Sequence, residues 1–169
     1  MSQSSIRQNA LIRATRRAHK PALCLSLIIL SACSGSPPDN LGVDRGRLAP
    51  CPSSPNCVSS QADSGDQQIA PLTLQGSPSQ TRARLVDILT GEPGVRLVAQ
   101  DAHYLRAEFS SQVLRFIDDV EFLIGEERVE VRSASRLGYS DFGVNRKRIE
   151  RLRQRLAEQP QEPVGLDPP

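Results

Sequence analysis

The feature that most constrains the fold is a period-two alternation of apolar and polar residues through the middle of the chain. Successive side chains of a strand point to opposite faces, so this alternation is typical of strands that cover a core on one side. Leu105, Ala107 and Phe109 share a face in this way, as do Leu114 and Phe116 further on. The stretches with this pattern, or with a short apolar run, are 95–99, 103–110, 114–124 and 129–134. The turn residues between them predict about four consecutive antiparallel strands.

Stretches with helical periodicity lie on both sides of these strands. Ser77 followed by Pro78 is typical of a helix start, and Gly91 is typical of a helix end. A second helix is expected to begin near Asn145. The apolar residues at helical spacing are Leu85, Val86, Ile88 and Leu89 in the first helix and Ile149, Leu152 and Leu156 in the second. The sequence therefore predicts an α+β fold, in which an antiparallel sheet is flanked by an N-terminal and a C-terminal helix.

The start of the chain has the composition of a secretory signal. Five basic residues and no acidic residue precede an apolar run over 21–30, which is about half of the ~20 residues needed to span a bilayer. The run ends in Leu30-Ser31-Ala32-Cys33, which resembles the bacterial lipobox, where the cysteine receives a diacylglycerol thioether and becomes the new N-terminus. Three other interpretations stay open: an ordinary secretory signal, a twin-arginine export signal and an organelle transit peptide.

From the lipobox we expect acylation of Cys33, with palmitate as one of the acyl groups. The protein is then lipid-anchored in the bacterial cell envelope and faces the periplasm, and the membrane is its expected partner. Ser34 rather than Asp follows the cysteine, which favours the outer membrane. Without residues 1–32, 16 basic and 19 acidic residues remain, a formal charge of −3. The net positive charge of the whole chain therefore comes from the signal peptide, and it gives no reason to expect a nucleic-acid partner.

The domain organisation is predicted from changes in composition along the chain. Residues 1–32 form the lipoprotein signal peptide, and residues 33–50 form the lipidated cysteine and a flexible tether rich in Pro and Gly. Residues 51–159 are expected to fold as a single α+β domain. Residues 160–169 are expected to be a disordered Pro-rich tail.

Cys51 and Cys57 lie close together in the sequence, with Pro52 and Pro55 bending the chain between them. In the oxidising envelope, two cysteines on such a turn are most simply a disulfide. The rival interpretation is a zinc site, which needs about four ligands, although the mature chain has one histidine, His103. We therefore expect the disulfide, and neither a metal nor a cofactor.

A dense group of polar side chains follows the predicted sheet and is the candidate site. Asp118, Ser133 and Ser135 have the parity of core-facing residues, so they must be hydrogen-bonded or line a cavity. One interpretation is a closed network in which Arg136 or Arg146 pairs with Asp118 and the next helix is capped by Asp141 or Asn145. The other is a polar pocket at the sheet end, where the two arginines face an anionic ligand. The candidate pocket residues are Asp118, Ser133, Ser135, Arg136, Asp141, Asn145 and Arg146.

Three segments carry a resemblance to a known family. They are 51–60, which contains both cysteines, 118–122, which begins with Asp118-Asp119, and 132–146, which runs from Arg132-Ser133-Ala134-Ser135-Arg136 to Asn145-Arg146. Together they resemble the domain-of-unknown-function 1499 family over nearly all of the expected folded part. The resemblance implies that this part of the chain folds as one domain and that the protein belongs to the cell envelope. It assigns no catalytic residue.

The sequence favours a binding or assembly module over an enzyme. A serine hydrolase needs a base near its serine, and the one candidate is His103. Asp118 and Asp119 are adjacent in a strand, so they point to opposite faces and cannot flank one glycosidic bond. An envelope hydrolase that uses the polar cluster remains the alternative, and the expected partners are an anionic ligand or another envelope protein. The last helix also has basic residues that are either solvated or near anionic headgroups; they are Arg146, Lys147, Arg148, Arg151, Arg153 and Arg155.

Overall fold

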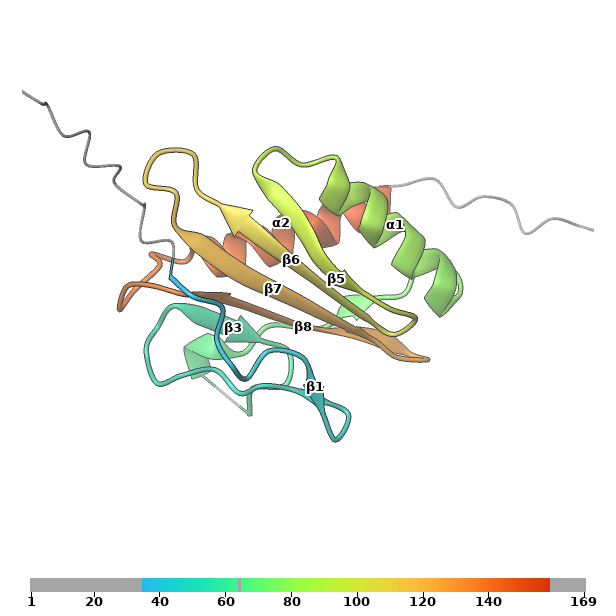
Figure 1. The fold of residues 1–169 in the computed structure, drawn as a ribbon. Helices are drawn as coiled ribbons and strands as arrows, with labels where there is room; N and C mark the ends of the chain where they lie inside the picture. Colours follow the sequence, from blue (N-terminus) through green and yellow to red (C-terminus); the bar gives the residue numbers. More distant parts are fainter. Residues whose placement is uncertain (1–34, 64, 159–169) are drawn as a thin grey trace, which may run out of the picture. The chain divides into compact units, whose positions relative to one another are not determined.

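The computed structural model describes residues 35–63 and 65–158, and Figure 1 shows their arrangement. Within these residues, six strands form one antiparallel sheet with the order β3-β8-β7-β6-β5, and β4 pairs with β8 beside β3. The strands are β3 (Cys57–Ser59), β4 (Leu72–Thr73), β5 (Val95–Gln100), β6 (Tyr104–Ser110), β7 (Ile117–Ile124) and β8 (Arg128–Ser135). The other elements are β1 (Val43–Asp44), β2 (Arg47–Leu48), a 3₁₀ turn (Gly65–Gln67), α1 (Pro78–Thr90) and α2 (Val144–Glu158). The predicted α+β class is confirmed.

Helix α1 begins and ends where the sequence predicts. The Ser77 hydroxyl accepts a hydrogen bond from the backbone N–H of Gln80, and the Gln80 side chain accepts one from the backbone N–H of Ser77. This reciprocal capping box satisfies two N–H groups that the helix leaves free. Pro78 occupies the first turn and Gly91 is the C-cap. The local signals therefore set these boundaries.

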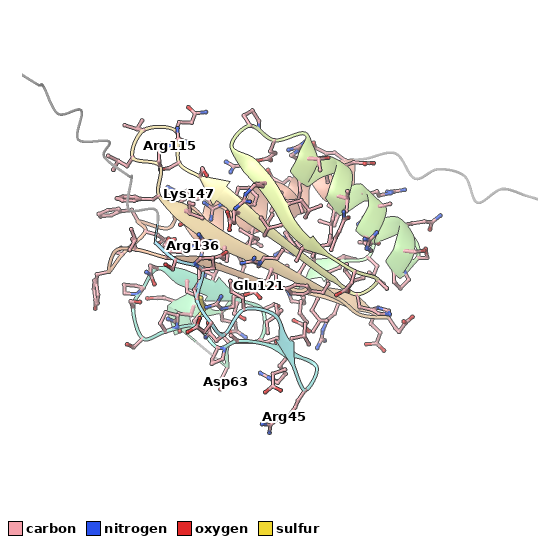
Figure 2. All side chains as sticks on the ribbon, in the orientation of Figure 1. Arg45, Asp63, Arg115, Glu121, Arg136 and Lys147 are labelled. Atoms are coloured by element: carbon pink, nitrogen blue, oxygen red, sulfur yellow. A yellow bond between two sulfur atoms is a disulfide. The ribbon has the colours of Figure 1, made fainter. Side chains whose placement is uncertain are left out.

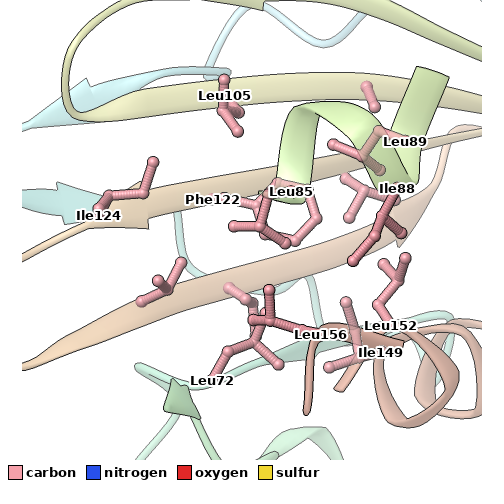
Figure 3. Packing of buried hydrophobic residues seen from close by; sticks show 14 of the residues in the cluster. Leu72, Leu85, Ile88, Leu89, Leu105, Phe122, Ile124, Ile149, Leu152 and Leu156 are labelled. Atoms are coloured by element: carbon pink, nitrogen blue, oxygen red, sulfur yellow. The ribbon is translucent and has the colours of Figure 1, made fainter. Parts of the chain in front are cut away.

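Both helices lie on one face of the sheet, and the hydrophobic core fills the space between the two layers (Figure 1; Figure 3). The helix residues that point into this core are the predicted ones, Leu85, Ile88 and Leu89 of α1 and Ile149, Leu152 and Leu156 of α2. Opposite them, Leu105 and Phe122 are fully buried in the sheet. Burial of one such side chain contributes about 1.5–3 kcal/mol. The predicted core-facing parity is thus confirmed for β6 and β7.

The structure differs from the prediction at one strand start and in the number of strands. Leu114 and Phe116 were expected on the core face, but they lie in the β6–β7 connection and are 65% and 46% exposed. Arg115 between them has φ 54°, which no strand allows, so β7 begins later, at Ile117. The strands that the prediction missed are β1 and β2, which form a separate two-stranded sheet, and β3 and β4 of the main sheet; each has two or three residues, too few to show alternation.

Residues 35–50 pack on the face of the sheet opposite the helices. The backbone N–H of Gly42 donates to Glu121 Oε1 at 2.7 Å, and that of Leu48 donates to Gln61 Oε1 at 2.8 Å. The Leu48 side chain is buried. Part of the segment predicted as a tether is therefore in contact with the sheet.

The expected signal peptide, Cys33 and the Pro-rich tail lie outside the described residues. Among residues 35–63 and 65–158, neither helix is long and apolar enough to cross a bilayer.

Candidate functional site

The polar cluster on the helix side of the sheet brings together four of the seven predicted site residues. Asp118 of β7 and Ser133 and Ser135 of β8 point toward α2, as their parity predicts. Asn145, in the first turn of α2, meets them: the Ser133 hydroxyl donates to Asn145 Oδ1 at 2.6 Å, and Asn145 Nδ2 donates to the Ser135 hydroxyl at 3.0 Å. The same amide nitrogen donates to the Asn56 backbone carbonyl at 3.0 Å.

Arg148 of α2 completes this cluster, and sequence reasoning missed it. Its guanidinium donates to the Ser133 hydroxyl at 3.0 Å, to Asn145 Oδ1 at 2.5 Å and to the Asp118 carboxylate. The guanidinium also lies 4.7 Å from the centre of the Phe109 ring, a cation–π arrangement. A signal was present in the sequence, since Arg148 lies three positions after Asn145 and therefore on the same face of the helix.

The helix-side cluster is buried and its groups bond to one another. The side chains of Asp118, Ser133, Asn145 and Arg148 are all buried. A buried charge is tolerated when it is paired and its remaining donors are bonded, and the hydrogen bonds of Arg148 meet that condition. The cluster therefore joins α2 to β7 and β8. The interpretation as a closed network is favoured over an open pocket at this position.

Arg136 lies on the opposite face of the sheet, so the interpretation that it pairs with Asp118 is wrong. It follows Ser135 by one residue, and alternation turns its side chain away from the helices. Arg136 Nε and Nη2 donate to the two oxygens of Asp119 at 2.7 and 2.9 Å, and Nη2 also donates to Glu108 Oε1 at 2.5 Å. The hydrogen bonds to Asp119 raise the pKa of Arg136 above its ordinary value, outweighing the opposite effect of burial.

These residues belong to a largely buried ionic network on the face that residues 35–50 cover, where Figure 2 labels Arg136 and Glu121. Glu121 accepts hydrogen bonds from Arg132 Nη1 at 3.0 Å, from the Tyr104 hydroxyl at 2.8 Å and from the Gly42 N–H. Burial, and then the nearby charge of Glu121, raise the pKa of Tyr104. We call this group the far-face network; it consists of Arg96, Tyr104, Arg106, Glu108, Asp119, Glu121, Arg132 and Arg136.

Cross-strand pairing explains why the far-face network needs its arginines. Glu108 of β6 lies directly opposite Asp119 of β7 in the sheet register, and like charges in such positions repel. Arg136 donates to both carboxylates, Arg106 donates to Asp119 at 3.3 Å, and Arg96 donates to Glu108 at 2.6 Å. Three arginines therefore offset the repulsion between the carboxylates of Glu108 and Asp119.

Asp141 and Arg146, the remaining predicted residues, lie beside the cluster and take no part in it. Asp141 accepts hydrogen bonds from the backbone N–H groups of Gly143 and Asn145 at 2.9 and 2.7 Å, so it caps α2. Arg146 donates to the backbone carbonyls of Asp66 and Gln68, each at 2.7 Å, so its predicted pairing with Asp118 is wrong. Both residues line a surface hollow of about 540 Å³ next to Cys57.

The turn that precedes β3, beside this hollow, contains the predicted disulfide. Cys51 and Cys57 are bonded, with 5.6 Å between their Cα atoms. The backbone of Cys57 pairs with that of Ala134 in the sheet, so the disulfide ties the preceding turn to β3.

Most of the basic residues of α2 bind within the protein. Arg153 donates to Glu150 and to the carbonyls of Ala70 and Pro71, and Arg155 pairs with Glu92. The exposed cations of the helix are Lys147 and Arg151. Most of the basic side chains of α2 therefore stabilise the fold, and few of them contribute to an exposed positive surface.

The arrangement around His103 does not resemble a catalytic dyad. Its Nδ1 lies 3.3 Å from the carbonyl oxygen of Ile124, across the β6–β7 pair. A general base must reach the proton that it removes, and the serines of the cluster bond to Asn145 and Arg148 instead.

Fold and site together define a small α+β domain with helices on one face of an antiparallel sheet and a buried ionic network on the other. The family model DUF1499, described as a protein of unknown function, matches residues 47–156, and the chain belongs to this family. The sequence resemblance is thereby confirmed. No curated protein and no solved structure matches the chain.

Proposed function

We propose that the protein is a lipid-anchored module of the bacterial cell envelope that binds or assembles with other envelope components, in preference to an envelope hydrolase that uses the polar cluster. Its proposed place is the periplasmic side of the outer membrane, held by acylated Cys33. The lipobox, the basic head and the short apolar run of the signal support the anchor. The bond between Cys51 and Cys57 supports an oxidising compartment.

The observation that carries a non-catalytic role is the closure of the polar cluster. Ser133, the best buried of its hydroxyls, donates to Asn145 and accepts from Arg148, so neither its proton nor its lone pair is directed at an open cleft. Asp118 accepts from Arg148 in the same buried group. A hydrolase built on this cluster would have to break these bonds to admit a substrate, which supports binding over hydrolysis.

An anionic ligand would meet the protein at the hollow next to Cys57. Arg146 lines that hollow and is partly exposed, whereas the side chain of Arg136, the other predicted pocket arginine, is buried. Two backbone carbonyls hold its guanidinium in place, and a guanidinium fork suits carboxylate or phosphate. A second envelope protein with an acidic side chain offers the same chemistry.

The anchor is tested by metabolic labelling of the full chain in bacteria with a clickable palmitate analogue. We expect label on the wild type and none on Cys33→Ser. Cys24→Ser is the matched control, since Cys24 lies inside the apolar run and should be removed with the signal. Label that persists on Cys33→Ser would refute the anchor.

The choice between a binding module and a serine hydrolase is tested with a fluorophosphonate probe, which reacts with activated serines. We expect no reaction with the native chain. Reaction at Ser133 or Ser135, located by peptide mass spectrometry and lost in the corresponding alanine variant, would overturn the proposal in favour of a hydrolase.

A further inference from the structure

Exposed apolar side chains gather in two connections of the chain. Among the described residues, eight large hydrophobic side chains are exposed, and seven of them belong to the β6–β7 connection or to the β8–α2 connection and its first helical residue. They are Val113, Leu114, Phe116, Leu137, Tyr139, Phe142 and Val144. We call this set the apolar tip. Exposed apolar groups that cluster on a water-soluble surface mark a site of interaction.

The two connections lie at the same end of the sheet. In the β7–β8 register Asp118 is opposite Ser135, so β7 begins where β8 ends. The backbone N–H of Arg136 donates to the Ile117 carbonyl at 3.1 Å and joins the two connections directly. Figure 1 shows both of them, and the blue start of the described chain, at this end of the sheet.

Local hydrogen bonds hold the tip in an outward conformation. In the first connection the Ser111 hydroxyl accepts from the Phe116 N–H at 2.9 Å, and the Ser111 N–H donates to the Phe116 carbonyl. In the second, Phe142 has φ 53° and is 89% exposed, between Asp141 and Gly143, which bond to each other. A bulky residue in the left-handed region is strained, and here the strain presents an aromatic ring to the outside.

The proposed anchor leaves the domain beside this tip. The carbonyl of Gly35 accepts from Arg136 Nη1 at 3.3 Å, and a Cβ on Gly35 would lie 3.4 Å from Leu137 Cγ. Cys33 precedes Gly35 by two residues, and an extended chain spans at most ~3.6 Å per residue. The Cα atom of Cys33 is therefore within about 7 Å of the Cα atom of Gly35. Acyl chains on Cys33 would begin next to the apolar tip.

Exposed cations accompany the tip and match an anionic membrane surface. Arg115 lies within the first connection, and Lys147 lies in the first turn of α2 (Figure 2). The carboxylate of Asp141 faces backbone N–H groups. Basic residues near a membrane are attracted by anionic lipid headgroups, and an apolar surface beside them can enter the headgroup and acyl boundary.

We propose that the apolar tip inserts into the phospholipid bilayer that holds the anchor, so that the domain stands on the membrane with the β7–β8 turn directed away from it. This inference rests on the proposed lipid anchor for its membrane. It adds a second, direct contact with lipid that orients the domain. The strands of the sheet then point away from the bilayer, and the hollow at Arg146 lies near the end of the domain that contacts the membrane.

The chain has no tryptophan, so one introduced indole reports on its own surroundings. We would place it at the tip with Phe142→Trp, or at the far end with Glu127→Trp, an exposed residue of the β7–β8 turn. The acylated proteins are reconstituted into phosphatidylcholine–phosphatidylglycerol vesicles that contain lipids brominated along their acyl chains. We expect blue-shifted, quenched emission for Phe142→Trp and unshifted, unquenched emission for Glu127→Trp. Equal quenching at both positions, or none at Phe142→Trp, would overturn the proposal.

The unacylated mature chain, residues 33–169, separates this inference from the anchor. We expect it to bind the same vesicles weakly, and Leu114→Ser to weaken that binding about tenfold. Thermal melting confirms that the variant is folded. If labelling shows that Cys33 is not acylated, the proposed anchor is refuted. Quenching of the indole at position 142 in the unacylated chain would still support insertion of the apolar tip into the bilayer. Self-association in sedimentation, with a blue-shifted indole before vesicles are added, would instead assign the tip to contact between copies of the chain and overturn membrane insertion.

Discussion

Replacement of Arg136 by methionine tests whether the far-face network is held together by one buried cation. The Arg136 side chain is 4% exposed and donates to Asp119 and Glu108, which face each other across β7 and β6. Methionine keeps the apolar stem and removes the guanidinium. Loss of one partner of a buried ion pair costs about 3–5 kcal/mol. Because Arg106 and Arg96 each keep one contact with this pair, we expect about 3 kcal/mol, the lower end of that range.

Arg96→Met is the matched control. Arg96 donates to the same carboxylate, Glu108, at 2.6 Å, but its side chain is 73% exposed. A solvent-exposed ion pair contributes at most about 1 kcal/mol. Urea unfolding of the mature chain, followed by far-ultraviolet circular dichroism, gives the free energy of unfolding of each variant. If Arg136→Met costs no more than Arg96→Met, burial does not decide the strength of these pairs and the reasoning is wrong.

The pH dependence of the Arg136→Met effect has a defined sign. Burial alone raises the pKa of Glu108, but hydrogen bonds from Arg136 and Arg96 outweigh it and hold this pKa below its ordinary value in the folded protein. Glu108 therefore stabilises the fold above the pKa of an unfolded glutamate, about 4.3, and this contribution disappears as the pH falls through the folded pKa. The difference between wild type and Arg136→Met should be largest above about pH 5 and should narrow below about pH 4. A constant difference down to about pH 3 would contradict this explanation.

Three further variants test single contacts by the same urea assay. Arg148→Met leaves Asp118 buried without its partner, so we expect a loss of about 3 kcal/mol; a loss no larger than that of an exposed pair would refute the closed network. Asp141→Ala removes the cap of α2 and should cost about 1 kcal/mol; an unchanged free energy of unfolding would contradict a stabilising cap. Conversion of Cys51 and Cys57 to serine opens a short loop and should cost about 2 kcal/mol; an unchanged urea midpoint would count against that estimate.

Local patterns were sufficient to predict the elements that form the core. The alternation around Leu105 and Phe122 assigned their core face correctly, and the cap at Ser77 and the stop at Gly91 located α1. These signals are readable because each depends on neighbours within a few residues. The same argument placed Ser133 on the helix side of the sheet, where the structure has it.

The short strands β3 and β4 and the partners in the ion pairs could not be predicted from local patterns. Strands β3 and β4 exist because β8 offers them backbone partners at Ser133 and Val129, and a two- or three-residue strand has no alternation of its own. The sequence prediction paired Asp118 with Arg136 or Arg146, and the structure pairs it with Arg148. Arginine side chains are long, so proximity in sequence does not select which carboxylate each one reaches.

By itself the sequence determined the class of this protein: an α+β domain of the DUF1499 family, with its core-facing residues, the caps of α1 and the disulfide between Cys51 and Cys57. Only the tertiary structure decided which charges pair, that residues 35–50 cover the far face of the sheet, and that Gly35 lies beside Arg136 and Leu137 at the end of the sheet where β7 begins. The physical reason is the range of the interactions. Backbone geometry and hydrophobic periodicity act between near neighbours, whereas buried ion pairs and surface patches join residues that only the completed fold brings together.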